Sequence, residues 1–208
     1  MFGHPFKSHR VSVILQAYEV NALSYFPGLS QASPSLTLDS EMSVSALLKS
    51  ASQSSGIDDK LHESRSLTLK TSLLLEPILD RLFKTLSRGE RQRVMLACEL
   101  MSQPTKPALL LFKEPCTAMD AQFKSRTVEL IKSLKEEGHA IVVTLQEASL
   151  ASRMGDDFFM VGSQGFVAEG DHSVMTTANL SQLFEVEVES TEPTEEGYPQ
   201  FTVSGSSF

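Results

Sequence analysis

Glu114 is an acidic residue placed where a carboxylate can take part in ligand chemistry. It follows the short apolar run 108–112, which lies between prolines and suits a strand buried on both faces. Open α/β folds bind their ligands at the carboxyl edge of a parallel sheet, where such a residue would lie. The sequence therefore predicts a ligand site beside Glu114.

Ser87 and Glu90 have the spacing of a capping box, in which a hydroxyl and a carboxylate satisfy free backbone N–H groups at a helix start. Behind them Val94, Ala97 and Met101 share one helical face. The sequence therefore predicts a helix that begins at Ser87 and ends before the prolines that follow.

A second helix is predicted over residues 121–137, because Asp120 can cap its start and Gly138 can end it. The run 140–145 reads as another strand buried on both faces. A strand, a helix and a strand at this spacing predict a right-handed parallel crossover from 108–112 to 140–145.

Two glutamines follow predicted strands, Gln16 after 11–15 and Gln146 after 140–145. Further along the chain, 158–161 and 166–169 are separated by a glycine-containing turn and predict a hairpin.

The serine-rich residues 30–55 contain one short amphipathic pattern, which predicts either a helix around Val44–Leu48 or a surface segment without regular structure. An apolar stripe over Leu73–Phe83 predicts another helix, with Pro77 in its first turn.

The composition bounds the class of protein. A chain of 208 residues with 41% apolar residues suits one domain, or one domain with a subdomain, and no apolar run approaches the roughly 20 residues that span a bilayer. We expect no signal peptide, because the first residues lack a basic stretch followed by an apolar one. The net charge of −8 argues against a nucleic-acid partner, and the two cysteines have no metal-binding spacing.

Three blocks of sequence, LSRGERQR, LLLFKEP and AMD, occur in that order between residues 86 and 120. They resemble the nucleotide-binding subunits of ATP-binding-cassette (ABC) transporters, which read L-S-G-G-[QE]-x-Q-R, then D-E-P, then L-D. The segment from Gly170 to Val186 resembles the C-terminal part of the importers for siderophores, haem and cobalamin.

The resemblance implies an α/β fold with a P-loop NTPase-like parallel sheet core, N-terminally incomplete, and an inserted helical subdomain. It implies a single domain over 1–208, in which 17–103 form the helical subdomain with the signature helix. Residues 104–208 would then form half of the α/β core and a C-terminal tail.

The resemblance also assigns roles to individual residues. Ser87, Gly89 and Glu90 match the signature motif that contacts the partner's nucleotide, and Asp120 matches an aspartate that communicates across the dimer. Glu114 matches the catalytic glutamate that orients water.

Gln16 matches the glutamine that reaches the metal and marks the contact with the membrane subunit. Alternatively, Gln16 is an ordinary polar loop residue, and Asp120 only caps its helix.

Several family positions are altered. Arg88 replaces the first signature glycine, Lys113 replaces the metal-binding aspartate, and Gln146 replaces the histidine that contacts the γ-phosphate, so the sequence predicts no metal ligands here. No window matches the phosphate loop G-x-x-x-x-G-K-[ST], for which we expect a shortened gene, a wrongly chosen start or a fragment.

The altered residues leave alternatives open. Lys113 either pairs with Glu114 or extends to solvent, or its ammonium substitutes for the metal. The Arg88 side chain either obstructs the approach of the nucleotide's phosphate, or swings aside to admit it, or contacts the phosphate itself.

From the resemblance, ATP and Mg²⁺ are the expected cofactors, although these losses predict that the chain does not hydrolyse ATP by itself. The expected partners are a second ABC ATPase subunit, in a homodimer or a heterodimer, and transmembrane permease subunits at the cytoplasmic face of a membrane. The alternatives are a non-enzymatic pseudo-ATPase that binds an ABC complex and a non-functional truncated relic.

Overall fold

The computed structural model describes residues 9–17, 41–53, 59–103 and 106–204, which are described below as two compact units. One, the sheet unit, comprises Met1–Ser33, Ala108–Glu114 and Leu130–Phe208. The other, the helical unit, comprises Pro34–Pro107 and Pro115–Glu129.

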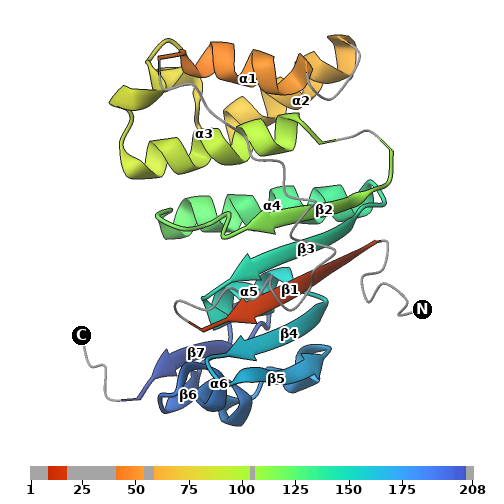
Figure 1. The fold of residues 1–208 in the computed structure, drawn as a ribbon, viewed down its shortest axis with the longest axis vertical. Helices are drawn as coiled ribbons and strands as arrows, with labels where there is room; N and C mark the ends of the chain where they lie inside the picture. Colours follow the sequence, from red (N-terminus) through yellow and green to blue (C-terminus); the bar gives the residue numbers. More distant parts are fainter. Residues whose placement is uncertain (1–8, 18–40, 54–58, 104–105, 205–208) are drawn as a thin grey trace. The chain divides into compact units, whose positions relative to one another are not determined.

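The sheet unit is built on a five-stranded sheet with the order β2-β3-β1-β4-β5 (Figure 1). Four strands are parallel, and β5 pairs antiparallel with β4 as the second half of a hairpin. The strands are β1 (Arg10–Gln16), β2 (Leu109–Lys113), β3 (Ala140–Leu145), β4 (Asp157–Gly162) and β5 (Gly165–Gly170). The predicted α/β class with a mainly parallel sheet is therefore confirmed.

The apolar runs of the inner strands form the core of the sheet unit. Ile14, Val142 and Val161 are fully buried and pack in one cluster with Leu111 and Phe159. Such runs are apolar at most positions because both faces of a parallel sheet are covered, which is why they lack the alternation of a half-exposed strand.

The other elements of the sheet unit pack around these strands. Helix α5 (Ala148–Met154) contacts β1 and β3, and α6 (Thr177–Phe184) contacts β4 and β5. A separate two-stranded sheet is formed by β6 (Val188–Thr191) and β7 (Gln200–Val203).

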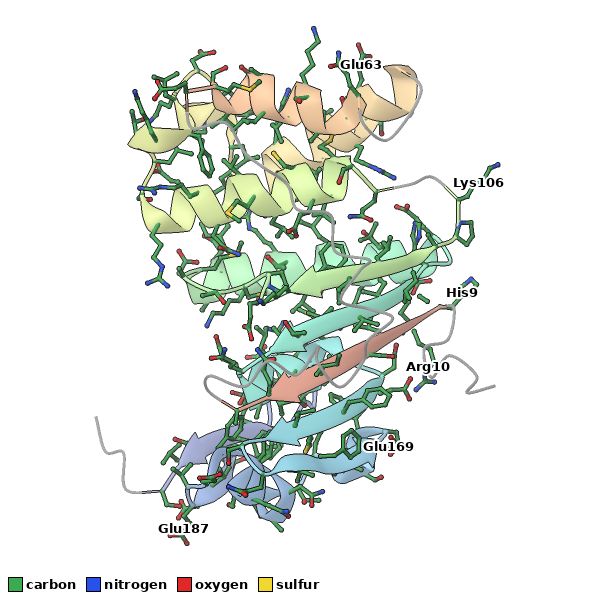
Figure 2. The ribbon with its side chains drawn as sticks, in the orientation of Figure 1. His9, Arg10, Glu63, Lys106, Glu169 and Glu187 are labelled. Carbon is green, nitrogen blue, oxygen red and sulfur yellow. The ribbon has the colours of Figure 1, made fainter. Side chains whose placement is uncertain are left out.

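Strand β1 lies at the centre of the sheet and is held at its first residues by charge. Figure 2 labels His9 and Arg10 at this end. The guanidinium of Arg10 donates to both carboxylate oxygens of Asp157, with a distance of 2.7 Å from Nη2 to Oδ1. Asp156 accepts from the Val11 N–H at 2.8 Å and from Lys135 Nζ at 2.8 Å. These bonds hold the start of β1 beside the start of β4.

The helical unit contains α1 (Val44–Gln53), α2 (Asp59–Ser72), α3 (Arg88–Met101) and the first part of α4 (Ala121–Glu136). Both α1 and α2 pack against α3 (Figure 1). Helix α1 confirms the amphipathic pattern predicted within 30–55; the remaining part of that segment, except 41–43, lies outside the described residues.

The helix predicted over Leu73–Phe83 is absent from the structure, which is a correction to the sequence analysis. Two short 3-10 helices, Glu76–Ile78 and Phe83–Thr85, occupy this stretch and its end. Pro77 is the second residue of the first of them, and Leu74 has a φ of 47°, which ends α2 in a left-handed conformation. A residue at positive φ cannot continue a right-handed helix, so the apolar stripe is buried by turns instead.

Candidate functional site

At the carboxyl edge of the sheet, Gln16 and Glu114 lie in direct contact. The Gln16 side chain is the last of β1 and its residue is only 5% exposed. Its Nε2 donates to Glu114 Oε1 at 3.0 Å, across 98 residues of chain. The structure therefore brings together two of the predicted site residues.

Thr144 holds the backbone of Glu114 at the same edge. The Glu114 N–H donates to the carbonyl oxygen and to Oγ1 of Thr144, each at 3.1 Å. Thr144 is 1% exposed and belongs to β3, which lies between β1 and β2. The sequence analysis did not identify Thr144; the available signal was a polar residue next to the end of an otherwise apolar strand.

Lys113 and Gln146 lie at the ends of neighbouring strands. Lys113 ends β2, pairs in register with Thr144 and is exposed, whereas Gln146 follows β3 and is half-buried. The exposure of Lys113 agrees with the alternative in which its side chain extends to solvent. Glu114 Oε1 accepts its hydrogen bond from Gln16.

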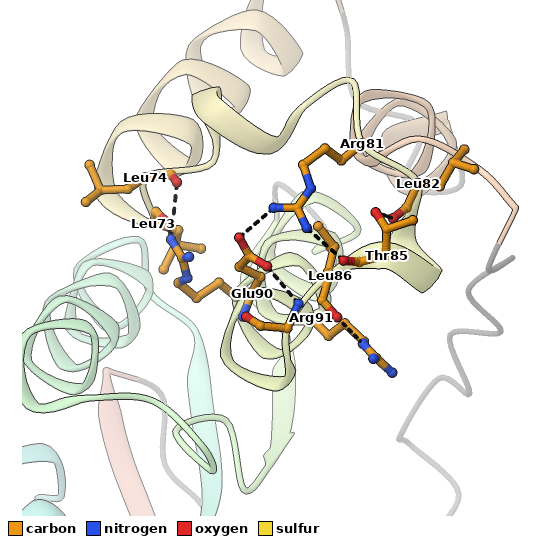
Figure 3. A network of polar contacts seen from close by, with 10 residues as sticks. Leu73, Leu74, Arg81, Leu82, Thr85, Leu86, Glu90 and Arg91 are labelled. Carbon is orange, nitrogen blue, oxygen red and sulfur yellow. Dashed lines mark hydrogen bonds and ion pairs between the residues drawn. The ribbon is translucent and has the colours of Figure 1, made fainter.

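In the helical unit, α3 begins with the capping box that the sequence predicts (Figure 3). Ser87 Oγ accepts from the Glu90 N–H at 3.2 Å, and the Glu90 carboxylate accepts from the Ser87 N–H at 2.7 Å. Two of the N–H groups that a helix start leaves unsatisfied are thereby bonded.

Arg81 extends this network beside the helix start (Figure 3). It forms an ion pair with Glu90 at 2.8 Å and donates to the Thr85 carbonyl at 2.7 Å. The Ser87 backbone bond is the main cause that lowers the pKa of Glu90, and Arg81 adds to it. Glu90 therefore stays ionised to lower pH than an ordinary glutamate.

Gly89 and Arg88 occupy the first turn of α3. A Cβ built on Gly89 would lie 3.2 Å from the Ala118 carbonyl oxygen, which is closer than most side chains tolerate. Ala118 has a φ of 63° in the turn that leads to Asp120. Because Gly89 has no Cβ, the first turn of α3 and the 118–120 turn can lie close to each other. The neighbouring Arg88 is exposed.

Asp120 acts as the cap of α4 that its position predicts. Its Oδ1 accepts from the Phe123 N–H at 3.0 Å, and the side chain is exposed. The predicted residues thus form two groups: Gln16, Lys113, Glu114 and Gln146 in the sheet unit, and Ser87, Arg88, Gly89, Glu90 and Asp120 in the helical unit.

The residues at the sheet edge do not fit Mg²⁺. This cation prefers carboxylate and water oxygens in an octahedron, whereas Lys113 presents an ammonium and Glu114 Oε1 accepts a bond from Gln16. Among the described residues, moreover, no group of three or more His, Cys, Asp or Glu side chains could hold a metal ion. The same part of the chain contains no helix long and apolar enough to span a membrane.

Comparisons with curated proteins relate the chain to ABC ATP-binding proteins. It is 27% identical over 143 residues to the hemin import ATP-binding protein HmuV of Photobacterium damselae, covering 66% of this chain and 54% of that protein. It is 34% identical over 99 residues to the arginine transport ATP-binding protein ArtP of Haemophilus influenzae, covering 48% and 40%. The chain thus spans about half the length of the curated relatives it matches. No protein-family profile matches it.

Solved structures of ABC transporter ATPase subunits have a similar fold. A solved structure described as an inward-facing conformation of a metal-chelate type ABC transporter superposes with a TM-score of 0.72 at 17% identity. The match covers 94% of this chain and 88% of that chain. The chain is thus similar in sequence to the ATP-binding subunits of ABC transporters, as the motifs suggested, and it shares their fold.

Proposed function

We propose that the chain is a degenerate ATP-binding subunit of an ABC importer that is impaired in ATP hydrolysis. The observation that carries this proposal is a contrast between the two groups of site residues. The start of α3 keeps its capping box and Gly89, whereas the sheet edge has Lys113 and a Glu114 that is bonded to Gln16.

In this proposal α3, which begins with the signature motif, contacts a nucleotide that is bound by a partner subunit. A helix N-terminus favours anions because its N–H groups and its dipole point toward them. The partner, a second ABC ATP-binding subunit in a homodimer or a heterodimer, would supply the phosphate loop that faces this helix. Permease subunits would hold the pair at the cytoplasmic face of the membrane.

For the transported substrate we propose an iron–siderophore, haem or cobalamin chelate. The support is the relative named as a hemin importer and the similar structure described as a metal-chelate type transporter. The arginine transport relative gives the competing class of substrate, a small amino acid.

A second candidate is a pseudo-ATPase that binds an ABC complex without taking part in hydrolysis. It is favoured by the same Gln16–Glu114 bond, because the Glu114 oxygen that accepts from the amide is less available to orient water. It predicts saturable binding to another ABC subunit and no ATP binding by the isolated chain.

The test is the ATPase rate of an intact ABC ATP-binding subunit mixed with this chain and with an Arg88→Gly variant. Removing the exposed Arg88 side chain clears the approach to the start of α3, so the variant is expected to raise the rate at least threefold above the wild-type mixture. Lys49→Ala, an exposed change on α1, is the matched control and should leave the rate as it is.

The outcomes separate the hypotheses. Binding without any change of rate, for wild type and Arg88→Gly alike, selects the pseudo-ATPase. Absence of both binding and rate change removes the role in transport. A relic would in addition melt broadly and bind an apolar dye, whereas a sharp two-state melt contradicts it.

A further inference from the structure

Glu114 is held by side chain and backbone at the edge of the sheet. Its Oε1 accepts from Gln16 Nε2 at 3.0 Å, and this bond is charge-assisted because the acceptor is a carboxylate. Gln16 is itself buried at the end of the central strand β1, so its amide has little freedom to leave the carboxylate.

The backbone of Glu114 adds a second restraint. Its φ of 48° is left-handed, a conformation that a residue with a side chain adopts only where its surroundings enforce it. The enforcing contacts are the two bonds from the Glu114 N–H to Thr144, at 3.1 Å each. Glu114 at the end of β2 is thus tied to β1 through its side chain and to β3 through its backbone.

The neighbour of Glu114 is unsuited to a metal-dependent role. Lys113 is the last residue of β2, directly before Glu114, and its charged side chain is exposed at this strand end. A divalent cation bound by Glu114 Oε1 would compete with the Gln16 amide, and it would share this strand end with the Lys113 ammonium. Both effects oppose binding.

We propose that Gln16, Glu114 and Thr144 form a metal-free polar clasp that closes the carboxyl edge of the sheet. In this clasp Glu114 is a structural residue that fixes the point where the chain leaves β2, and it does not bind a divalent cation. The inference concerns the isolated chain, so it stands apart from the proposed role in transport.

The first experiment measures paramagnetic broadening of backbone amide NMR signals in the full chain by Mn²⁺, a probe for Mg²⁺ sites. The Glu114 and Thr144 signals of the wild type should keep their intensity as Mn²⁺ is raised to about ten equivalents. The Lys113→Asp variant places two adjacent carboxylates at this edge and should lose these signals selectively. Selective, saturable loss in the wild type would overturn the proposal, as would equal behaviour of the two proteins.

The second experiment tests the clasp by a double-mutant cycle in urea unfolding. Gln16→Ala and Glu114→Ala should each lower the unfolding midpoint, and the double variant should lose clearly less than the two single losses combined. The control cycle pairs Gln16→Ala with Glu169→Ala, an exposed residue of β5, and should be additive. An additive result for Gln16 and Glu114 would show that the clasp is not formed.

Because a variant can fail to fold, Glu114→Gln is measured beside Glu114→Ala. The glutamine keeps an oxygen acceptor at the same place, so it should recover most of the midpoint lost in Glu114→Ala. Absence of recovery would also contradict the clasp. None of these measurements requires ATP or a partner, so their failure is distinct from failure of the proposed function.

Discussion

At the scale of single residues, Glu90 couples the stability of the helical unit to pH. Its folded-state pKa is lowered, chiefly by the bond from the Ser87 N–H, below the ordinary value of 4.5. A group with a depressed pKa contributes stability above its unfolded pKa and loses it as the pH falls through the folded pKa. The contribution should therefore be complete at neutral pH and decline below about pH 4.5.

We expect Glu90→Gln to lower the free energy of unfolding by about 1 kcal/mol at pH 7, the usual contribution of a hydrogen bond of this kind. The difference from wild type should shrink between pH 5 and pH 3, because the wild-type carboxylate becomes protonated there. Urea unfolding across this range measures it, with Glu169→Gln as the exposed control. A stability difference that does not change with pH would show that it does not come from the ionised Glu90 carboxylate.

Cys98 gives a second prediction at this scale. Burial raises the pKa of its thiol to about 12, and the residue is 0% exposed. The thiolate is the reactive form, so native protein at pH 8 should resist a disulfide reagent such as dithionitrobenzoate. Cys116, 2% exposed, should resist too, and both should react in denaturant. Stoichiometric labelling of native protein within minutes would contradict this.

Residue contacts could be predicted from the sequence when the partners are close in the chain. The Ser87–Glu90 box spans four residues and depends only on a helix starting there. The Gln16–Glu114 bond spans 98 residues and depends on which strands are neighbours, which no local pattern specifies. The role of Thr144 could not be predicted for the same reason.

At the scale of elements, two arginines hold the C-terminal end of α2. Arg93 of α3 donates to the Leu73 carbonyl at 2.7 Å, and Arg126 of α4 donates to the Ser72 carbonyl at 2.8 Å. The Phe123 ring faces both guanidinium groups, at 4.2 Å from Arg93. Positive charge at a helix C-terminus opposes the negative end of its dipole and bonds its last carbonyls.

Removal of Arg93 should therefore loosen the end of α2. We expect Arg93→Ala to cost about 1–2 kcal/mol, because the substitution removes hydrogen bonds and a cation–π interaction at once. Amide hydrogen exchange should accelerate in the last turn of α2 and change little in β3. Arg93→Lys should recover only part of the loss, and uniform acceleration in both elements would show a different cause.

The extents of elements could be predicted where local signals agree. Strand 140–145 and the helix that Asp120 caps were predicted within one residue, because each joins an apolar pattern to a cap or a break. The stretch Leu73–Phe83 was predicted wrongly, because its apolar spacing suits a helix while Leu74 at positive φ and Pro77 impose turns.

At the scale of the whole molecule, the position of β1 is the feature that the sequence alone does not reveal. Apolar runs of similar composition can exchange places in a parallel sheet without altering any local pattern. Contacts at the strand ends, such as Arg10 with Asp157, favour the observed order. The charged residues at the starts of β1 and β4 are visible in the sequence, but the sequence does not say which of them form pairs.

This position predicts that Arg10 stabilises the sheet unit as a whole. Arg10→Met keeps the apolar stem but loses the bidentate pair, and we expect it to cost about 1–2 kcal/mol, since the pair is partly exposed. The loss should be seen as faster hydrogen exchange in β1, β3 and β4 together. Lys106→Met, an exposed change, is the control, and a loss confined to the first residues of β1 would contradict the prediction.

The central place of β1 also has a consequence for synthesis on the ribosome. Arg10 and its partner Asp157 are 147 residues apart, so at ordinary elongation rates β1 waits roughly 7–30 s for its neighbours to be made. Until β3 is made near the end of that interval, the mainly apolar residues 11–15 have none of their native strand partners, and unpaired strands of this kind bind other chains. A nascent chain of this protein is therefore a natural client for chaperones that act at the ribosome.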